Sequence, residues 1–171
     1  ALPIYFGKDS SNFVDDGIKV ERKVELYEHQ TVSLQEIQKR RDAGIKAFLI
    51  VLPTAAGKSK IVEEDLRTFA EGKQKFRGLI LVPGVNLLLD WEERIKASLP
   101  ELKDKIDIRT YAFAARHYTD TTPDYYNYLV VDEAHHAVAP VLKRVVQYYR
   151  TEFTIGLTAT DQRPDKRKLE T

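Results

Sequence analysis

Five short apolar runs recur along the chain, and a turn or helix-like segment separates each run from the next. The runs lie at residues 47–52, 78–82, 106–108, 128–131 and 153–157. Runs of this length are too short for helices and are typical of strands in a parallel sheet, in which helices make the crossover connections. The alternation therefore predicts an α/β fold, a doubly wound and mainly parallel sheet with helices on both faces.

The chain is long enough for one domain with one core, since it has 171 residues of which 43% are hydrophobic. Residues 1–24 mix glycine with polar side chains and are expected to be a lead-in. Residues 25–171 are expected to form a single lobe. The first apolar run, at residues 47–52, predicts a strand buried on both faces of the sheet. Helices are expected at residues 27–43, 58–71, 86–98, 112–116 and 138–149.

A glycine, a lysine and a hydroxyl follow the first apolar run, where a strand gives way to a helix: Gly57, Lys58 and Ser59. Backbone N–H groups of such a turn point at one place, with the positive end of the helix dipole behind them, which suits a polyphosphate. Lys58 would reach the β and γ phosphates, and the Ser59 hydroxyl would hold Mg²⁺. The expected nucleotide-binding turn comprises Pro53, Thr54, Ala55, Ala56, Gly57, Lys58 and Ser59.

One residue departs from the full phosphate-loop pattern, because Leu52 stands where that pattern has its first glycine. A surface turn with a chance lysine is therefore the alternative. The position of the turn, after an apolar strand and before a helix, favours phosphate binding.

Two carboxylates, Asp132 and Glu133, follow the fourth apolar run. A carboxylate that ends a strand beside the phosphate-binding strand can hold the Mg²⁺ that bridges the phosphates, which is the role expected of Asp132. Glu133 would orient and deprotonate the attacking water. Two acids after a strand can also form a solvated loop. Together with the turn at Lys58, however, they favour an ATP-hydrolysing site.

His135 and His136 come next and raise the question of a metal site. Adjacent side chains point in different directions, and the chain has no cysteine to complete a tetrahedral zinc set. His135 is therefore expected to be a coupling residue within hydrogen-bonding reach of the next strand. The lack of cysteine also excludes a disulfide framework and fits a reducing compartment, so the cytoplasm is the expected location.

The overall charge does not indicate a partner. Lys and Arg number 27 against 26 Asp and Glu, a formal net charge of +1, so affinity for nucleic acid would depend on the local placement of basic residues. No apolar run approaches the roughly 20 residues that span a bilayer, and the first residues lack the pattern of a signal peptide. No contact with a membrane is expected.

The motifs resemble those of superfamily 2 helicases and follow one another in that family's order. The segment Asp132-Glu133-Ala134-His135 resembles the DEAH form of motif II. Residues 53–59 resemble motif I, with Ala55 in place of a more usual glycine, and residues 158–160 resemble motif III. Residues 156–165 as a whole are similar to an extended motif of type I and type III restriction-enzyme motor subunits. Weaker similarities to that branch lie at residues 26–30, 81–83, 88–91 and 110–111.

The resemblance implies the first RecA-like lobe of a helicase or DNA translocase, with ATP and Mg²⁺ as cofactors and catalysis by Lys58, Asp132 and Glu133. It also implies that DNA, or alternatively RNA, is the partner. A second RecA-like lobe, outside this chain, would supply an arginine finger. The further residues with implied roles are Gln30 on adenine, His135, Thr158 and Thr160 in coupling, and Pro83, Gly84, Thr110 and Tyr111 on nucleic acid.

Two other functions could use the same pocket. A nucleotide-binding switch or regulatory module would bind ATP without moving on nucleic acid. A small-molecule kinase would need a lid over its acceptor substrate, which the sequence does not indicate. Stimulation of ATP hydrolysis by DNA or RNA separates the motor from the switch.

Overall fold

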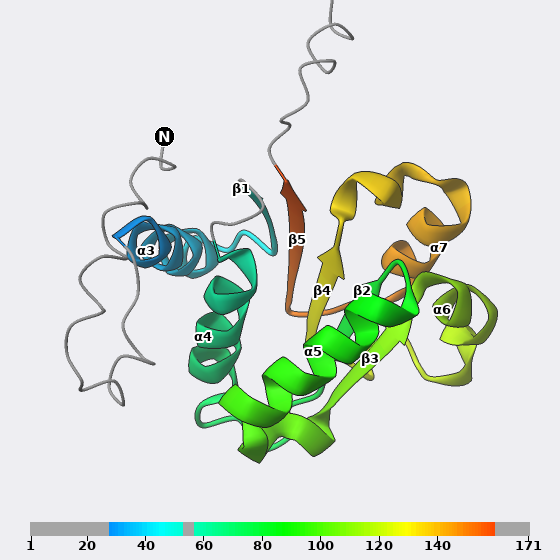
Figure 1. Ribbon diagram of the computed structural model, residues 1–171, viewed down its shortest axis with the longest axis horizontal. Coiled ribbons are helices and arrows are strands. Elements are labelled where there is room, and N and C mark those ends of the chain that lie inside the picture. The colour runs from blue at the N-terminus through cyan, green and yellow to red at the C-terminus, as the bar shows by residue number, and fades with distance from the viewer. Residues whose placement is uncertain (1–27, 53–56, 160–171) are drawn as a thin grey trace, which may run out of the picture.

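Five parallel strands form the centre of the protein in the computed structural model, which describes residues 28–52 and 57–159 (Figure 1). Their order across the sheet is β1-β5-β4-β2-β3, and every neighbouring pair is parallel. The predicted fold class, a doubly wound parallel sheet, is therefore confirmed. The strands are β1 (Ala47–Leu52), β2 (Gly78–Val82), β3 (Ile106–Thr110), β4 (Tyr128–Asp132) and β5 (Phe153–Ala159).

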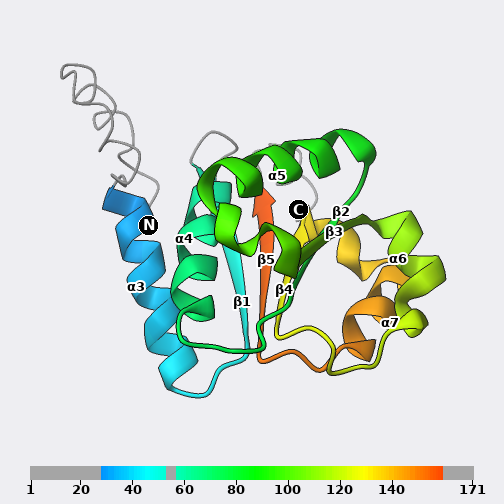
Figure 2. The same ribbon diagram turned by 90° about the horizontal axis from the view of Figure 1, so that it is seen from below.

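Helices cover both faces of this sheet (Figure 2). One buried apolar cluster includes residues of α3 (Glu28–Asp42), α4 (Lys58–Ala70) and α5 (Val85–Ser98). A second cluster includes residues of α6 (Tyr111–His117) and α7 (Pro140–Tyr148). Three short 3-10 helices complete the connections: η2 (Pro100–Lys105), η3 (Tyr118–Asp120) and η4 (Ala134–Val138). None of the helices in residues 28–52 and 57–159 is both long and apolar enough to cross a membrane.

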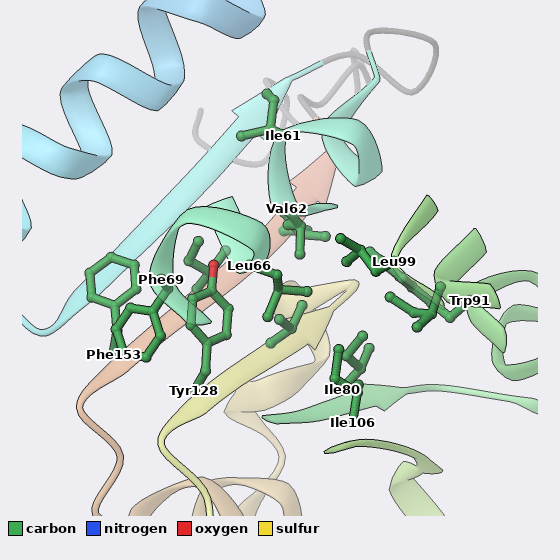
Figure 3. Close-up of a cluster of buried hydrophobic side chains, with 14 of the residues drawn as sticks. Ile61, Val62, Leu66, Phe69, Ile80, Trp91, Leu99, Ile106, Tyr128 and Phe153 are labelled. Carbon is green, nitrogen blue, oxygen red and sulfur yellow. The ribbon is translucent and has the colours of Figure 1, made fainter. Parts of the chain in front are cut away.

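The inner strands supply side chains to both clusters. On β2, Ile80 and Val82 belong to the cluster under α4 and α5, whereas Leu79 and Leu81 belong to the cluster under α6 and α7. This division follows from the alternation of side chains along a strand. Figure 3 shows the larger cluster, in which Trp91 of α5 lies at one end. The buried sheet thus forms a rigid base for the loops at its carboxyl edge.

The first strand differs from the prediction, which was burial on both faces. Leu49 and Val51 of β1 remain 56% and 47% exposed, while Ile50 and Leu52 are buried. The prediction of two buried faces is therefore wrong for this strand. The reason is its place in the sheet: β1 lies at the edge, and α6 and α7 pack over β2 and β4 instead.

Most helix boundaries agree closely with the sequence-based expectation, but the helix expected over residues 138–149 begins only at Pro140. Ala139 has φ −61° and ψ 136°, since a residue before proline avoids the helical region. For that reason η4 and α7 are separate elements. β5 is longer than predicted, so Thr158 lies on the strand itself. The expected lead-in, residues 1–24, lies outside the described residues.

Candidate functional site

Two segments predicted to bind nucleotide and metal lie at the carboxyl ends of parallel strands. Asp132 is the last residue of β4, and it pairs in register with Leu157 of β5, which in turn pairs with Ile50 of β1. Lys58 begins α4 shortly after β1 ends. Parallel pairing thus brings the ends of three strands to one edge of the sheet, the usual place for a ligand in such a fold. Four residues of the predicted turn, Pro53, Thr54, Ala55 and Ala56, lie outside the described residues.

Gly57 occupies a position that only glycine fits well. Its φ is 77°, in the left-handed region, and a Cβ atom there would lie 2.2 Å from Nε2 of Gln30. Gln30 is buried on α3 and donates a hydrogen bond from Nε2 to the carbonyl oxygen of Gly57, 3.2 Å away. The predicted adenine-contacting residue is therefore attached to the end of the predicted phosphate-binding turn.

Lys58 interacts electrostatically with both carboxylates of the predicted acidic pair. Its Nζ is 3.4 Å from the carbonyl oxygen of Leu52, at the end of β1. Burial lowers the pKa of Lys58, and the negative charges of Asp132 and Glu133 oppose that shift. Gly57, the residue before α4, has no capping side chain, so it leaves the first N–H groups of this helix without a side-chain cap. A half-buried cation and a helix N-terminus together suit an anionic ligand.

The carboxylate of Asp132 is held through both of its oxygens. Oδ2 accepts a hydrogen bond from the indole Nε1 of Trp91 at 2.9 Å, and Oδ1 accepts one from the backbone N–H of Glu133 at 2.9 Å. Burial raises the pKa of Asp132, and so does the charge of Glu133, whereas the bond from Trp91 and the charge of Lys58 act to lower it. The predicted metal ligand thus has a fixed orientation inside the protein.

Glu133 has an unusual backbone conformation, with φ 56° and ψ 50°. It is the only non-glycine residue with positive φ among those the structure describes. The hydroxyl of Tyr111 contacts this corner, donating to the carbonyl oxygen of Asp132 and lying 3.1 Å from that of Glu133. The Glu133 side chain is 39% exposed. The chain therefore turns sharply at the end of β4 and directs the second carboxylate toward solvent.

His135 lies beside the next strand, as its place in the sequence predicted. Its Nδ1 is 3.1 Å from the hydroxyl oxygen of Thr158 on β5, and its Nε2 is 3.6 Å from Oε1 of Glu133. It thus connects the predicted base to β5, while its role in coupling stays a prediction. The other predicted coupling residue, Thr160, lies outside the described residues.

The oxygen atoms at this site fit Mg²⁺, which prefers carboxylate, hydroxyl and phosphate oxygens and keeps several waters. Asp132 offers an anchored carboxylate, and Ser59 lies in the first turn of α4. In the described part of the chain, no group of three or more His, Cys, Asp or Glu could hold a metal ion. Mg²⁺ is commonly bound by one or two carboxylates together with phosphate oxygens of a nucleotide.

The four residues predicted to contact nucleic acid lie at two neighbouring strand ends. Pro83 and Gly84 form the turn from β2 to α5, and β2 pairs directly with β3, which ends at Thr110. The Thr110 side chain caps α6 by accepting from the N–H of Phe113 at 3.1 Å. Pro83 and Tyr111 line one cavity of about 380 Å³. The structure thus brings both turns to the same edge of the sheet as Asp132.

Sequence reasoning missed two of these contacts. Trp91 was noticed only as part of a motif, and Tyr111 only as a residue facing nucleic acid, yet both bind the Asp132–Glu133 corner. A buried indole needs a partner for its N–H, so the only tryptophan in the chain was a signal that could have been followed.

A profile of the family described as "Type III restriction enzyme, res subunit" matches residues 23–163. The chain is also 29% identical over 159 residues to the DNA 3'-5' translocase XPB2 of Sulfurisphaera tokodaii. That alignment covers 85% of this chain and 33% of the relative. The chain therefore spans about a third of the length of this relative.

Two solved structures share the fold. The Sulfolobus solfataricus SWI2/SNF2 ATPase core in complex with dsDNA matches with a TM-score of 0.69 and 21% identity, over 85% of this chain and 34% of that one. The Pyrococcus furiosus Hef helicase domain matches with a TM-score of 0.59 and 20% identity, over 81% of this chain and 34% of that one. At these identities the likeness is one of fold, that of a RecA-like helicase lobe.

Proposed function

Because the chain belongs to the family described as type III restriction enzyme, res subunit, we propose that it is the ATP-binding lobe of a nucleic-acid-dependent motor. In this proposal it is the first RecA-like lobe of a superfamily 2 helicase or translocase with a DEAH-type motif II. A motor subunit of a restriction enzyme is the specific parent that we favour, and the extended motif at residues 156–165 supports it.

One observation carries the proposal: a half-buried lysine at the start of a helix lies within electrostatic reach of an anchored acidic pair. Lys58 interacts with the charges of Asp132 and Glu133, although these residues come from a different strand. A positive charge for phosphates beside a carboxylate for their metal ion is the arrangement that nucleotide hydrolysis requires. An electrostatic interaction with two carboxylates of another strand is not expected of a chance lysine in a surface turn.

Each residue of this arrangement has a role in the proposed reaction. Lys58 and the N–H groups of α4 bind the β and γ phosphates. Ser59 and Asp132 hold Mg²⁺, which when bound neutralises charge on the phosphates. Glu133, with a partly exposed side chain, takes the proton of the attacking water. Gln30 contacts adenine while it supports Gly57, and Pro53, Thr54, Ala55 and Ala56 are the remaining residues proposed to bind nucleotide.

We propose that nucleic acid lies along the turns at Pro83, Gly84, Thr110 and Tyr111. Backbone phosphates are contacted by main-chain N–H groups, hydroxyls and helix N-termini, all of which occur at these turns. DNA is the favoured partner, because one relative is a DNA translocase and one structural neighbour was solved with dsDNA. His135, Thr158 and Thr160 would pass the state of the nucleotide to the rest of the motor.

A second RecA-like lobe completes the proposed site. The side chains of Glu133 and His135 are 39% and 52% exposed, so one side of the acidic corner is open to such a lobe. Its arginine would stabilise the charge that develops in the transition state, a contribution of about 10³ to 10⁵ in rate in well-studied nucleotide hydrolases. The chain on its own should therefore bind Mg-ATP weakly and hydrolyse it slowly.

The test is steady-state phosphate release, measured on residues 1–171 and on the full-length protein, with and without single- and double-stranded DNA and RNA. The expected result is slow release by the chain alone, with little response to nucleic acid, and a strongly stimulated rate for the full-length protein. If the full-length protein hydrolysed ATP without any response to nucleic acid, a nucleotide-binding switch would replace the motor as the proposed function.

A further inference from the structure

Trp91 makes a contact with the acidic corner that the proposed roles above leave unexplained. It lies in the middle of α5, is 2% exposed, and donates from its indole Nε1 to Oδ2 of Asp132 at 2.9 Å. The rest of the ring packs in the larger apolar cluster, which also contains Leu99 and is drawn in part in Figure 3. The residue therefore combines an apolar role in the core with one polar contact at the site.

The contact fixes the direction of a carboxylate that would otherwise rotate. Without a second partner, Asp132 could turn about its own side-chain bonds while keeping the bond from the Glu133 N–H. Because Trp91 donates to Oδ2 and the Glu133 N–H donates to Oδ1, each oxygen of the carboxylate has its own donor. A carboxylate oxygen can accept more than one contact, so each keeps capacity for a water or a metal ion.

The indole of Trp91, which supplies the donor, is a rigid group held by packing in the larger apolar cluster. An indole has only two side-chain torsions and one donor, with no acceptor. Phenylalanine would fill most of the same volume without any polar contact, so packing alone does not require tryptophan here. A buried donor aimed at a buried carboxylate is best explained by a need to hold that carboxylate.

We propose that Trp91 is a positioning residue whose indole N–H holds the carboxylate of Asp132 in the orientation that receives the metal ion of Mg-ATP. This inference rests on the proposed function of the site. It extends that function by assigning the metal affinity of Asp132 in part to a residue of α5, the helix that begins at the turn of Pro83 and Gly84.

The same contact makes the residue a reporter. Trp91 is the only tryptophan in the 171 residues, so all indole fluorescence of the chain comes from this position. Indole emission responds to charge near the ring nitrogen. A cation placed on Asp132 reduces the negative charge beside Nε1, and the emission must change as the metal site fills.

The first experiment titrates Mg²⁺ into residues 1–171 in the presence of adenylyl imidodiphosphate and records the emission of Trp91. A saturable change is expected, with the same midpoint as metal-dependent nucleotide binding measured by calorimetry. The change should be absent in Asp132→Asn. An emission that stays constant while calorimetry registers Mg²⁺-dependent binding would overturn the inference about Trp91 and leave the proposed function standing.

The second experiment replaces the donor. Trp91→Phe should raise the Mg²⁺ concentration for half-maximal nucleotide binding roughly tenfold, the size expected for a hydrogen bond to a charged group, without changing binding in EDTA. In the full-length protein it should raise the half-saturating Mg²⁺ concentration more than it lowers the rate at saturating Mg²⁺. If Trp91→Phe needed the same Mg²⁺ concentration as the unmodified protein, Trp91 would not be a positioning residue for Asp132.

The matched control is Ile95→Val, which removes one methylene from the same face of α5. Both variants should lower the melting temperature, but only Trp91→Phe should alter the Mg²⁺ requirement. Equal shifts in both would mean that Trp91 acts through packing alone. If the unmodified chain bound no nucleotide with or without Mg²⁺, both the inference and the proposed function would be wrong.

Discussion

The hydroxyl of Tyr111 lies 3.1 Å from the carbonyl oxygen of Glu133, at the corner where the backbone adopts a left-handed conformation. That conformation costs a non-glycine residue on the order of 1 kcal/mol or more. The contact with Tyr111 helps to offset this cost. Burial raises the pKa of Tyr111 above its ordinary value, so its hydroxyl stays protonated and able to donate well into the alkaline range.

Tyr111→Phe is therefore expected to loosen the Asp132–Glu133 corner without disrupting the fold. Losing the bond should lower the free energy of unfolding by about 0.5–1.5 kcal/mol. It should also slow ATP hydrolysis by the full-length protein while leaving nucleotide affinity nearly unchanged. Tyr148→Phe is the control, because it also removes a hydroxyl-to-carbonyl bond, to Thr121 at 2.6 Å, but away from the site. Equal rates of ATP hydrolysis in the two variants would show that the Tyr111 hydroxyl has no role at the site.

Lys58→Ala should abolish Mg-ATP binding by residues 1–171 and leave the melting temperature close to that of the unmodified chain. The reason is that Lys58 supplies the charge that faces the phosphates. Lys60→Ala, two positions along the same helix turn, removes a lysine that pairs with Glu63 and Glu64 and should bind nucleotide normally. Calorimetry with Mg²⁺ checks both, and an unaltered affinity in Lys58→Ala would exclude the assigned role.

Glu133→Gln should keep nucleotide binding but slow phosphate release by the full-length protein by two or more orders of magnitude, about the size of a general-base contribution. The metal ligand Asp132 is unchanged in this variant, and glutamine keeps nearly the same volume. Glu152→Gln, an exposed glutamate next to the start of β5, is the matched control. Turnover equal to that of the control would mean that another group activates the water.

Stability at high pH should depend on Tyr128. Burial raises the pKa of its hydroxyl well above the ordinary value, and the charge of Asp65 acts in the same direction. Because the pKa is higher in the folded state, this tyrosine's contribution to stability is complete below about pH 10, the unfolded pKa, and is lost as pH rises beyond it. The free energy of unfolding, measured with urea between pH 8 and 11, should therefore fall at the alkaline end.

Tyr128→Phe should make that alkaline fall shallower. At neutral pH the variant loses the 2.6 Å bond from the hydroxyl to Oδ2 of Asp65, at a cost of about 1–3 kcal/mol. Arg41 continues to pair with Asp65 through two bonds. Tyr125→Phe, at a position that is 37% exposed, should keep the steep alkaline fall. A slope in Tyr128→Phe as steep as that control would rule out the buried hydroxyl as the cause.

The sequence predicted the sheet well because a buried parallel strand has a distinctive composition. All five runs became strands, and the residues after them, Lys58 and Asp132 among them, meet at one edge. An alternation of apolar runs and helix-like segments does not, however, indicate the order of the strands within the sheet. The run at residues 47–52 was expected to be buried on both faces, but the order places it at the edge of the sheet.

Contacts between distant elements were also beyond the reach of local patterns. Trp91 and Asp132 are 41 positions apart, and their bond depends on how α5 crosses the sheet. Helical periodicity can indicate which side of a helix faces the core, but not which buried acceptor a side chain meets there. The left-handed conformation of Glu133 was equally hidden, since glutamate carries no local signal for positive φ.

The edge position of β1 has a practical consequence for handling the isolated chain. Among the described residues, β1 pairs with β5 on one side only, and its exposed Leu49 and Val51 lie along that same strand. An unpaired strand edge with apolar side chains is a template on which a second molecule can add a strand. Solutions of residues 1–171 should therefore scatter more light as concentration and time increase. Val51→Lys should keep such solutions clear.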